Sequence, residues 1–303
     1  VAHLAQALWD LIASLWLLAL AGGLFWRRID RLTLKPIYKA GLGSVLGITA
    51  VSAVTMVYGS VTALNPWGLR AILLVGSAVL WRPIYAWLNA FFSATQHTRP
   101  TSRLSWVIAA LLGAGFIFAL IKALAPPTAF DALAYHLALP QLYLDEGRIL
   151  ITPATVFSGM PQTQSISYML LFIGGVRAPA VLAWWWGVLA ALLIWHVSED
   201  MAPDVSPWLC LAIVFAGKSF FTMLTTGYTA SAIVMIGGLA IVLLVRWKDT
   251  REDAVLLLLG ALLGSAYTFK QGYALLPVLL GLLVMWELRR DWKAALRAEA
   301  LLI

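Results

Sequence analysis

Charged residues are scarce in this chain. Only 12% of its 303 residues are Asp, Glu, Lys or Arg, whereas a soluble domain of this size carries about 25%. Hydrophobic residues make up 62% of the sequence. This balance excludes a soluble enzyme, a disordered chain and a secreted disulfide scaffold, and it leaves a multi-span membrane protein.

Cysteine is nearly absent as well. The single Cys210 excludes both a disulfide within the chain and a cluster of thiolate metal ligands. The formal net charge of +7 does not indicate a nucleic-acid partner, because the basic residues fall in short clusters between apolar stretches. Clusters of this kind orient a chain in a bilayer.

Long apolar runs are what the sequence has in abundance. Because about 20 apolar residues cross the hydrocarbon as a helix, the sequence predicts an all-α, polytopic membrane protein with about nine transmembrane helices. The predicted crossings are 4–26, 40–59, 69–92, 104–125, 178–197, 207–226, 229–246, 254–270 and 273–288. Arg82 and Pro83 interrupt the third run, which is therefore either a kinked span or a short span followed by an interfacial helix.

Lys and Arg indicate the orientation of the chain. They collect around residues 27–39, 99–103, 246–251 and 289–297. If these loops are all cytoplasmic, an even number of crossings must separate each from the next. This condition is met only if residues 164–176 do not span the membrane. Segment 126–163 then lies outside. The acidic loop 198–206 falls inside, as an exception to the expected pattern.

The crossings predict two packing units, divided near the polar stretch 93–102. We expect residues 1–103, with the first three spans, to be an N-terminal extension, and residues 104–303, with the following six, to be a transmembrane core. A new apolar run begins at the C-terminal end, and the chain opens without Met. We therefore expect the sequence to be part of a longer polypeptide.

The external loop 126–163 concentrates the chemistry. Asp131, His136 and Arg148 lie within it, in a chain that otherwise avoids charge. Its pattern predicts short amphipathic helices at the membrane interface, with Phe130, Leu133 and Leu137 on the apolar face and Tyr135 and His136 opposite. Pro140 and Gly147 would punctuate these helices.

Several residues of this loop resemble a known family. The run FDALAYHL at 130–137, followed by Pro140, Tyr143, Gly147 to Ile149 and Pro161, resembles the first extracytoplasmic loop of GT-C superfamily membrane glycosyltransferases. It is most similar to the branch of protein mannosyltransferases and aminoarabinose transferases. The run GSAYTFK at 264–270 resembles a later helix of that branch, which ends in a Lys near the outer face.

The resemblance implies an enzyme. Such a transferase moves a sugar from a polyprenyl-phosphate carrier to an acceptor, at the outer face of a bacterial cytoplasmic (inner) membrane. Asp131 would be the catalytic base, Arg148 or Lys270 would bind the phosphate, and Tyr135 and His136 would contact the substrate. The implied partners are a lipid-linked sugar donor and membrane lipids. The spans and the ridge Trp184 to Trp186 would form the groove for the carrier tail.

The chain also departs from that family. Related transferases carry further acids where this sequence reads TTGYTAS at 225–231, and Gln162, Gln164 and Ser165 after Pro161. The missing carboxylates disfavour a divalent metal, and no metal ligand is assigned. They support a second hypothesis, a catalytically silent subunit that keeps the GT-C fold and acts as a scaffold in a larger membrane protein complex.

Each candidate residue also has a structural alternative. Asp131 stands where a helix N-cap is expected. His136 would be a polar residue on an interfacial helix, and Lys270 would reach lipid headgroups without binding a ligand. The surroundings of Asp131 distinguish the two functions, because an enzyme requires an open cavity beside that carboxylate.

Overall fold

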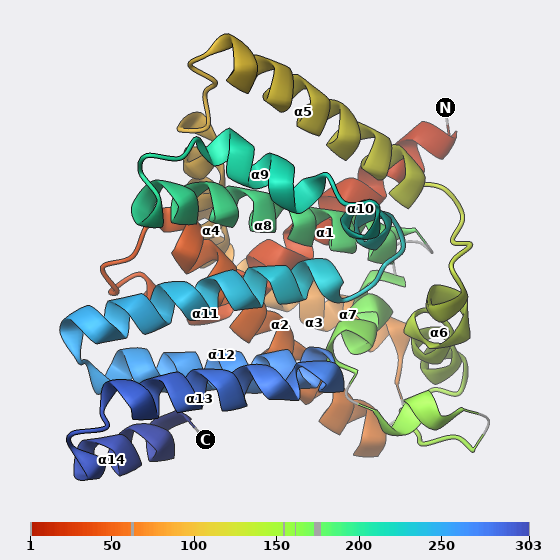
Figure 1. Ribbon diagram of the computed structural model, residues 1–303. Coiled ribbons are helices and arrows are strands. Elements are labelled where there is room, and N and C mark those ends of the chain that lie inside the picture. The colour runs from red at the N-terminus through yellow and green to blue at the C-terminus, as the bar shows by residue number, and fades with distance from the viewer. Residues whose placement is uncertain (1, 62–63, 154, 161, 173–176, 303) are drawn as a thin grey trace.

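Helices make up all the regular structure that the computed structural model describes, which covers residues 2–302 apart from 62–63, 154, 161 and 173–176. The predicted helical membrane class is therefore confirmed (Figure 1). Within this part of the chain, five helices are long and apolar enough to cross a membrane. They are α1 (Ala2–Ile29), α2 (Pro36–Val61), α5 (Arg103–Ala123), α8 (Ala178–Met201) and α11 (Ala230–Thr250).

The predicted count of nine spans is not confirmed, because the other predicted spans are broken or short. A sixth crossing exists if α3 (Pro66–Val79) and α4 (Trp81–Gln96), which meet at 77°, form one bent span. The predicted span 207–226 consists of α9 (Pro207–Phe215) and α10 (Lys218–Thr225).

The last two predicted spans are also shorter than a full crossing. Helix α12 (Asp253–Phe269) has 17 residues, about 25 Å of helix against a hydrocarbon core of about 30 Å. It is followed by the 3₁₀ turn η3 (Gln271–Ala274), by α13 (Leu275–Glu287) and by the terminal α14 (Trp292–Leu302). Helices α11, α12 and α13 run side by side (Figure 1).

The break in the third predicted run lies at Leu80 and not at Arg82 or Pro83. Both of these residues fall in the first turn of α4. Proline is tolerated there because the N–H groups of the first turn have no partner within the helix. The expected interruption is thus confirmed, but its position is shifted by two residues.

Glycines bring α1 and α2 into close contact. A Cβ atom added at Gly43 would lie 2.9 Å from the carbonyl oxygen of Gly22, and one added at Gly47 would overlap the carbonyl of Ala21. Small residues at such a crossing allow two membrane helices to pack backbone against backbone. This helix pair forms the base on which α4 and α8 pack.

One buried core joins the two predicted segments. Leu18 of α1 and Ile48 of α2 belong to the same cluster as Trp186 of α8 and Leu239 of α11. Both segments, 1–103 and 104–303, contribute to this core. The division between an N-terminal extension and a transmembrane core therefore stays a prediction from the sequence. No sheet or separate layer intervenes between them in the described residues.

Ion pairs gather the basic clusters at one end of the bundle. Lys35, before α2, lies 2.7 Å from Asp200 and 3.6 Å from Glu199, near the end of α8. Arg251 pairs with Glu287 at 2.9 Å, which ties the end of α11 to the end of α13. The acidic loop 198–206 is the exception to the expected charge pattern. Its Glu199 and Asp200 are paired with Lys35 at the same end of the bundle.

The predicted external loop lies at the other end of the same helices. Its Ile149 N–H donates to the carbonyl of Gly59 at 2.8 Å, and Gly147 accepts from the N–H of Leu64. Both contacts join the loop to the end of α2 opposite Lys35. Helix α6 (Ala138–Asp145) of the loop and the terminal α14 accordingly lie at opposite ends of the molecule in Figure 1.

The α1–α2 contact predicts a sharp steric effect. Gly47→Ala should destabilise the protein by about 1–3 kcal/mol, because the added methyl group overlaps a backbone carbonyl that side chains cannot relieve. Thermal unfolding in detergent measures the effect. Gly113→Ala on α5, where a Cβ meets no described atom within 4 Å, is the matched control, and equal melting temperatures for the two variants would contradict this packing.

Candidate functional site

The external loop folds into short helices, as its pattern predicts. A single π-helical turn, η1 (Ala132–His136), is followed directly by α6 (Ala138–Asp145) and later by the 3₁₀ turn η2 (Val156–Gly159). The loop then enters α7 (Thr163–Phe172), whose ten residues are too few to cross the membrane. The segment 164–176 is predicted not to span the membrane, and the short α7 agrees with this prediction as far as Phe172. Residues 173–176 lie outside the described part of the chain.

The faces of the first loop helix agree with the prediction in part. Phe130 is 80% exposed and Leu133 is 52% exposed, as an apolar face against the membrane requires, whereas Leu137, expected on the same face, and His136, expected opposite, are both buried. The π-helical turn rotates the following residues relative to an α-helix, so the histidine points inward. Its alternative role as a polar surface residue is therefore wrong.

The two expected helix breakers have different positions. Pro140 lies within the first turn of α6 and does not end a helix. Gly147 does end α6, since its φ of +66° is the left-handed conformation that glycine adopts at low cost. Pro161, the last residue quoted for the family resemblance, lies outside the described residues.

Asp131 does not cap the helix that it precedes. It has helical backbone angles, and its side chain makes no capping hydrogen bond. Its carboxylate instead lies beside two phenols, those of Tyr135 and Tyr228. Burial raises the pKa of Tyr135, and the Asp131 carboxylate raises it further through its charge and a hydrogen bond that it accepts from the phenol. Tyr135 therefore stays protonated and holds the carboxylate.

A cavity of about 240 Å³, called the polar cavity here for the amide and hydroxyl groups among its apolar lining, borders Tyr135 but is not lined by Asp131. Loop residues form one wall, the first turn of α7 forms the floor, and the segment after α12 closes the far side. The lining residues are Tyr135, His136, Phe157, Met160, Gln162, Gln164, Ser165, Thr229, Phe269, Lys270, Gln271 and Gly272. Lys270 carries the only formal charge among them at neutral pH, and none of these described residues is acidic.

His136 is a neutral member of the cavity wall. Burial lowers the pKa of its imidazole to about 4, and the positive charge of Lys270 lowers it in the same direction. Its Nδ1 lies 3.4 Å from the hydroxyl oxygen of Ser165 on α7. The ring also contacts Tyr135, with 4.2 Å between the ring centroids. A neutral imidazole of this kind accepts or donates a hydrogen bond without adding charge.

Gln164, one of the residues that line the cavity, has a side-chain oxygen without a described hydrogen-bond partner. The hydroxyl of Tyr168 donates to the carbonyl of Gly227 at 2.6 Å, so it can only accept from the amide of Gln164, which donates at 3.0 Å. This arrangement fixes the orientation of the amide. The Oε1 atom of Gln164 is buried and has no partner among the described residues, and an orphaned buried acceptor is rare in native proteins.

The predicted phosphate-binding residues separate in the structure. Lys270, the C-cap of α12, is exposed and lines the cavity close enough to His136 for its charge to act there. Arg148 is exposed on the loop and does not line the cavity. Of the predicted residues, Tyr135, His136 and Lys270 thus line the cavity, Asp131 is linked to it through Tyr135, and Arg148 lies outside it.

Sequence reasoning missed several residues of this site. Gln164 and Thr229 were interpreted as lost acids, yet both line the cavity, and Phe157 stacks on Tyr135 with 4.0 Å between the ring centroids. The signal was present in the polar run TQSIS at 163–167, because such a run in an apolar chain needs buried partners. Ser52 of α2 meets one of them, donating to the carbonyl of Thr163 at 2.8 Å.

The three tryptophans of the ridge on α8 have different surroundings. Trp186 is fully buried against Phe269, with 6.3 Å between the ring centroids. The indole N–H groups of Trp184 and Trp185 donate to the carbonyls of Phe116 and Leu11, at 2.9 and 3.0 Å. Trp184 also lines an apolar cavity of about 290 Å³ between α5, α8 and α9, so the groove for a carrier tail stays a prediction.

Metal ligands are not clustered in the described residues, where no three His, Cys, Asp or Glu side chains lie close enough to hold an ion. Comparisons of the chain with family models, with curated proteins and with solved structures found no match. The geometry of the cavity and the residues that line it therefore carry the functional argument.

The buried neutral histidine predicts a dependence of stability on pH. The folded pKa of His136, about 4, lies below the ordinary value of about 6.5. The unfolded chain therefore binds more protons between these values, and stability falls as the pH drops from about 6.5 to 4, by up to about 3 kcal/mol. Thermal unfolding across this range measures the loss.

His136→Gln should flatten that profile, while His97→Gln, at an exposed histidine, should leave it unchanged. A wild-type profile that matches the profile of the His136→Gln variant would show that His136 is not buried in its neutral form.

Proposed function

We propose that the protein is a glycosyltransferase that moves a sugar from a polyprenyl-phosphate carrier to an acceptor at the outer face of a bacterial cytoplasmic membrane. The observation that carries the proposal is the cavity lined by Lys270, Gln164 and Tyr135, the last of which is the hydrogen-bond partner of Asp131. A cavity one side chain away from this carboxylate is the feature expected of the enzyme and not of the scaffold.

The residues suit a simple displacement. Asp131 accepts the proton of the acceptor hydroxyl as its oxygen attacks the anomeric carbon of the sugar. The bond between that carbon and the phosphate oxygen breaks, and the electron pair leaves on the polyprenyl phosphate. Lys270 stabilises the departing phosphate through its positive charge. Tyr135 holds the carboxylate in place by its hydrogen bond.

The walls of the cavity suit a sugar ring. Amide and hydroxyl groups, from Gln162, Gln164, Ser165 and Thr229, alternate there with the aromatic face of Tyr135 and Phe157. Its volume of about 240 Å³ lies just under the range of roughly 300–1,000 Å³ for drug-sized ligands. One monosaccharide with its phosphate at Lys270 is therefore the expected occupant.

A scaffold within a membrane complex remains the second candidate. The specific observation in its favour is that the described lining of the cavity is free of acidic residues, so Asp131 would act alone. A scaffold also needs a surface for partners, and α5 offers one, because Leu104, Leu111 and Ile117 along it are all more than 60% exposed.

Removing the carboxylate tests the proposed reaction. Asp131→Asn should lower sugar transfer at least about 100-fold, as expected for the loss of a general base, with unchanged thermal stability. The measurement uses the full chain in proteoliposomes with a panel of radiolabelled polyprenyl-phosphate sugars. Asp145→Asn, at an exposed carboxylate on α6, is the control. Equal transfer by Asp131→Asn and wild type would remove the base assignment, and no transfer by the wild type with any donor would favour the scaffold.

The amide at the cavity floor has a separate test. Gln164→Met keeps the volume and removes the acceptor, so KM for the sugar donor should rise about tenfold, because the buried hydrogen bond to the ligand is lost. Gln141→Met is the control, since Gln141 is exposed and bonds only Asp145. An unchanged KM for Gln164→Met would show that the sugar does not reach this acceptor.

A further inference from the structure

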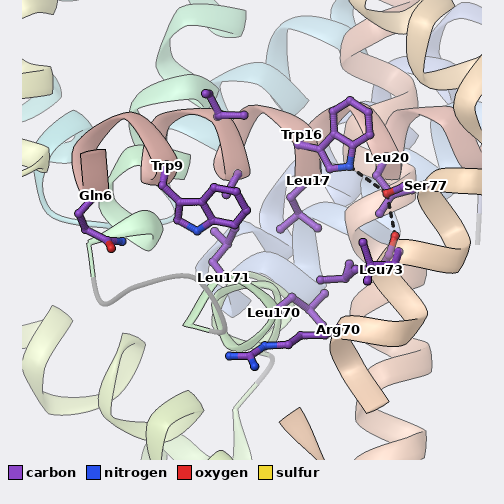
Figure 2. Close-up of a pocket in the computed structure, with 13 residues that line it drawn as sticks. Gln6, Trp9, Trp16, Leu17, Leu20, Arg70, Leu73, Ser77, Leu170 and Leu171 are labelled. Carbon is purple, nitrogen blue, oxygen red and sulfur yellow. Dashed lines mark hydrogen bonds between the residues drawn. The ribbon is translucent and has the colours of Figure 1, made fainter. Parts of the chain in front are cut away.

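A second and larger cavity lies at the C-terminal end of α7, whereas the polar cavity lies at its start. It has a volume of about 760 Å³ and lies between α1, α3 and the end of α7. Figure 2 shows Trp9, Trp16, Leu17 and Leu20 along the α1 wall, Leu73 and Ser77 on the α3 wall, and Leu170 and Leu171 on α7. Neither the sequence patterns nor the proposed reaction uses this cavity.

The cavity faces the lipid and not the protein interior. Trp9, Ile12 and Leu74, which line it, are 54%, 59% and 72% exposed on the surface of membrane helices. Large exposed apolar side chains at this depth contact hydrocarbon. A lateral opening between them therefore admits a chain from the bilayer and not a solute from water.

A single hydrogen bond holds the inner part of the two walls together. The indole N–H of Trp16 donates to the hydroxyl of Ser77 at 2.9 Å, and this hydroxyl donates in turn to the carbonyl of Leu73 at 2.7 Å (Figure 2). Both polar groups are thereby satisfied within the walls. The inner part of the cavity therefore presents only carbon atoms to an occupant.

Arg70 places a positive charge at the opposite, external end. It lies in the second turn of α3, close to the connection where Leu64 bonds Gly147 of the external loop. Its guanidinium lies 4.5 Å from the ring centroid of Trp67 and lines the cavity. Charge and hydrocarbon are thus arranged as in one leaflet of a bilayer.

The length of the cavity also matches one leaflet. From Arg70 to Ser77 the α3 wall covers seven residues, about 10 Å of helix. From Gln6 to Leu20 the α1 wall covers fourteen residues, about 21 Å. Half of the hydrocarbon core is about 15 Å. An acyl chain of the outer leaflet fits between these walls with its headgroup at the level of Arg70.

We propose that this cavity between α1, α3 and α7 binds an anionic glycerophospholipid of the outer leaflet, with its phosphate at Arg70 and one acyl chain against Trp16 and Leu20. A guanidinium forms paired, charge-assisted hydrogen bonds with phosphate oxygens. The lipid contacts α7 at Leu170 and Leu171, near the end of the helix that is farther from the polar cavity. This binding is independent of sugar transfer, so each is testable without the other.

Lipid retention measures this binding directly. The full chain is reconstituted in vesicles of equal parts phosphatidylglycerol and phosphatidylcholine, extracted in mild detergent and examined by native mass spectrometry. Wild-type protein should retain phosphatidylglycerol about 5- to 10-fold more often than phosphatidylcholine, as expected for one charge-assisted contact. Arg70→Gln should abolish this preference, and Ala13→Trp, which fills the cavity, should reduce retention of both lipids.

Arg82→Gln is the matched control, because Arg82 also stacks on a tryptophan, 5.2 Å from the ring centroid of Trp81, and lies outside this cavity. It should leave the preference intact. Equal retention of the two lipids by the wild type, or the same loss of preference in Arg70→Gln and Arg82→Gln, would overturn the assignment to Arg70. Undiminished retention in Ala13→Trp would overturn the assignment to this cavity.

Discussion

The polar first turn of α7, held inside an apolar bundle, is the constraint on which the rest of the site depends. Its side chains from Thr163 to Tyr168 are buried, and a buried polar group must find a hydrogen-bond partner or lose stability. Ser52 of α2 meets this turn from one side, and the Gly227 carbonyl accepts from Tyr168 on the other. These contacts fix α7 between the external loop and the membrane helices, and one amide oxygen is left for a ligand.

Glycines and ion pairs set the frame around that helix. Close packing of α1 on α2 leaves the end of α2 free to join the external loop through Gly59 and Ile149. At the opposite end, Lys35 and Asp200 tie α2 to α8. Such exposed pairs contribute little free energy each. Their effect is to collect the basic clusters on one side, which is consistent with the predicted orientation.

The sequence predicts the class and part of the site, but not the count of spans. Composition and run length are properties of single segments, so the helical membrane class follows from them. Asp131, Tyr135, His136 and Lys270 are instead indicated by the resemblance to GT-C transferases. Helix breaks such as the one at Leu80 depend on packing. The role of Gln164 could not be predicted from the sequence. An amide at a position where the related transferases carry an acid indicates only a missing carboxylate, until its buried neighbours are known.

The central claim is that the polar cavity opens to the external face and receives a polyprenyl-linked ligand. Gly272 lines this cavity, and a side chain added there meets no described atom within 4 Å. In a Cys210→Ser background, Gly272→Cys should react in intact cells with a membrane-impermeant maleimide and be protected by polyprenyl phosphate. Ser206→Cys, at the basic end, should react only after permeabilisation. The reverse pattern, or labelling of Gly272→Cys that no polyprenyl phosphate slows, would contradict the account.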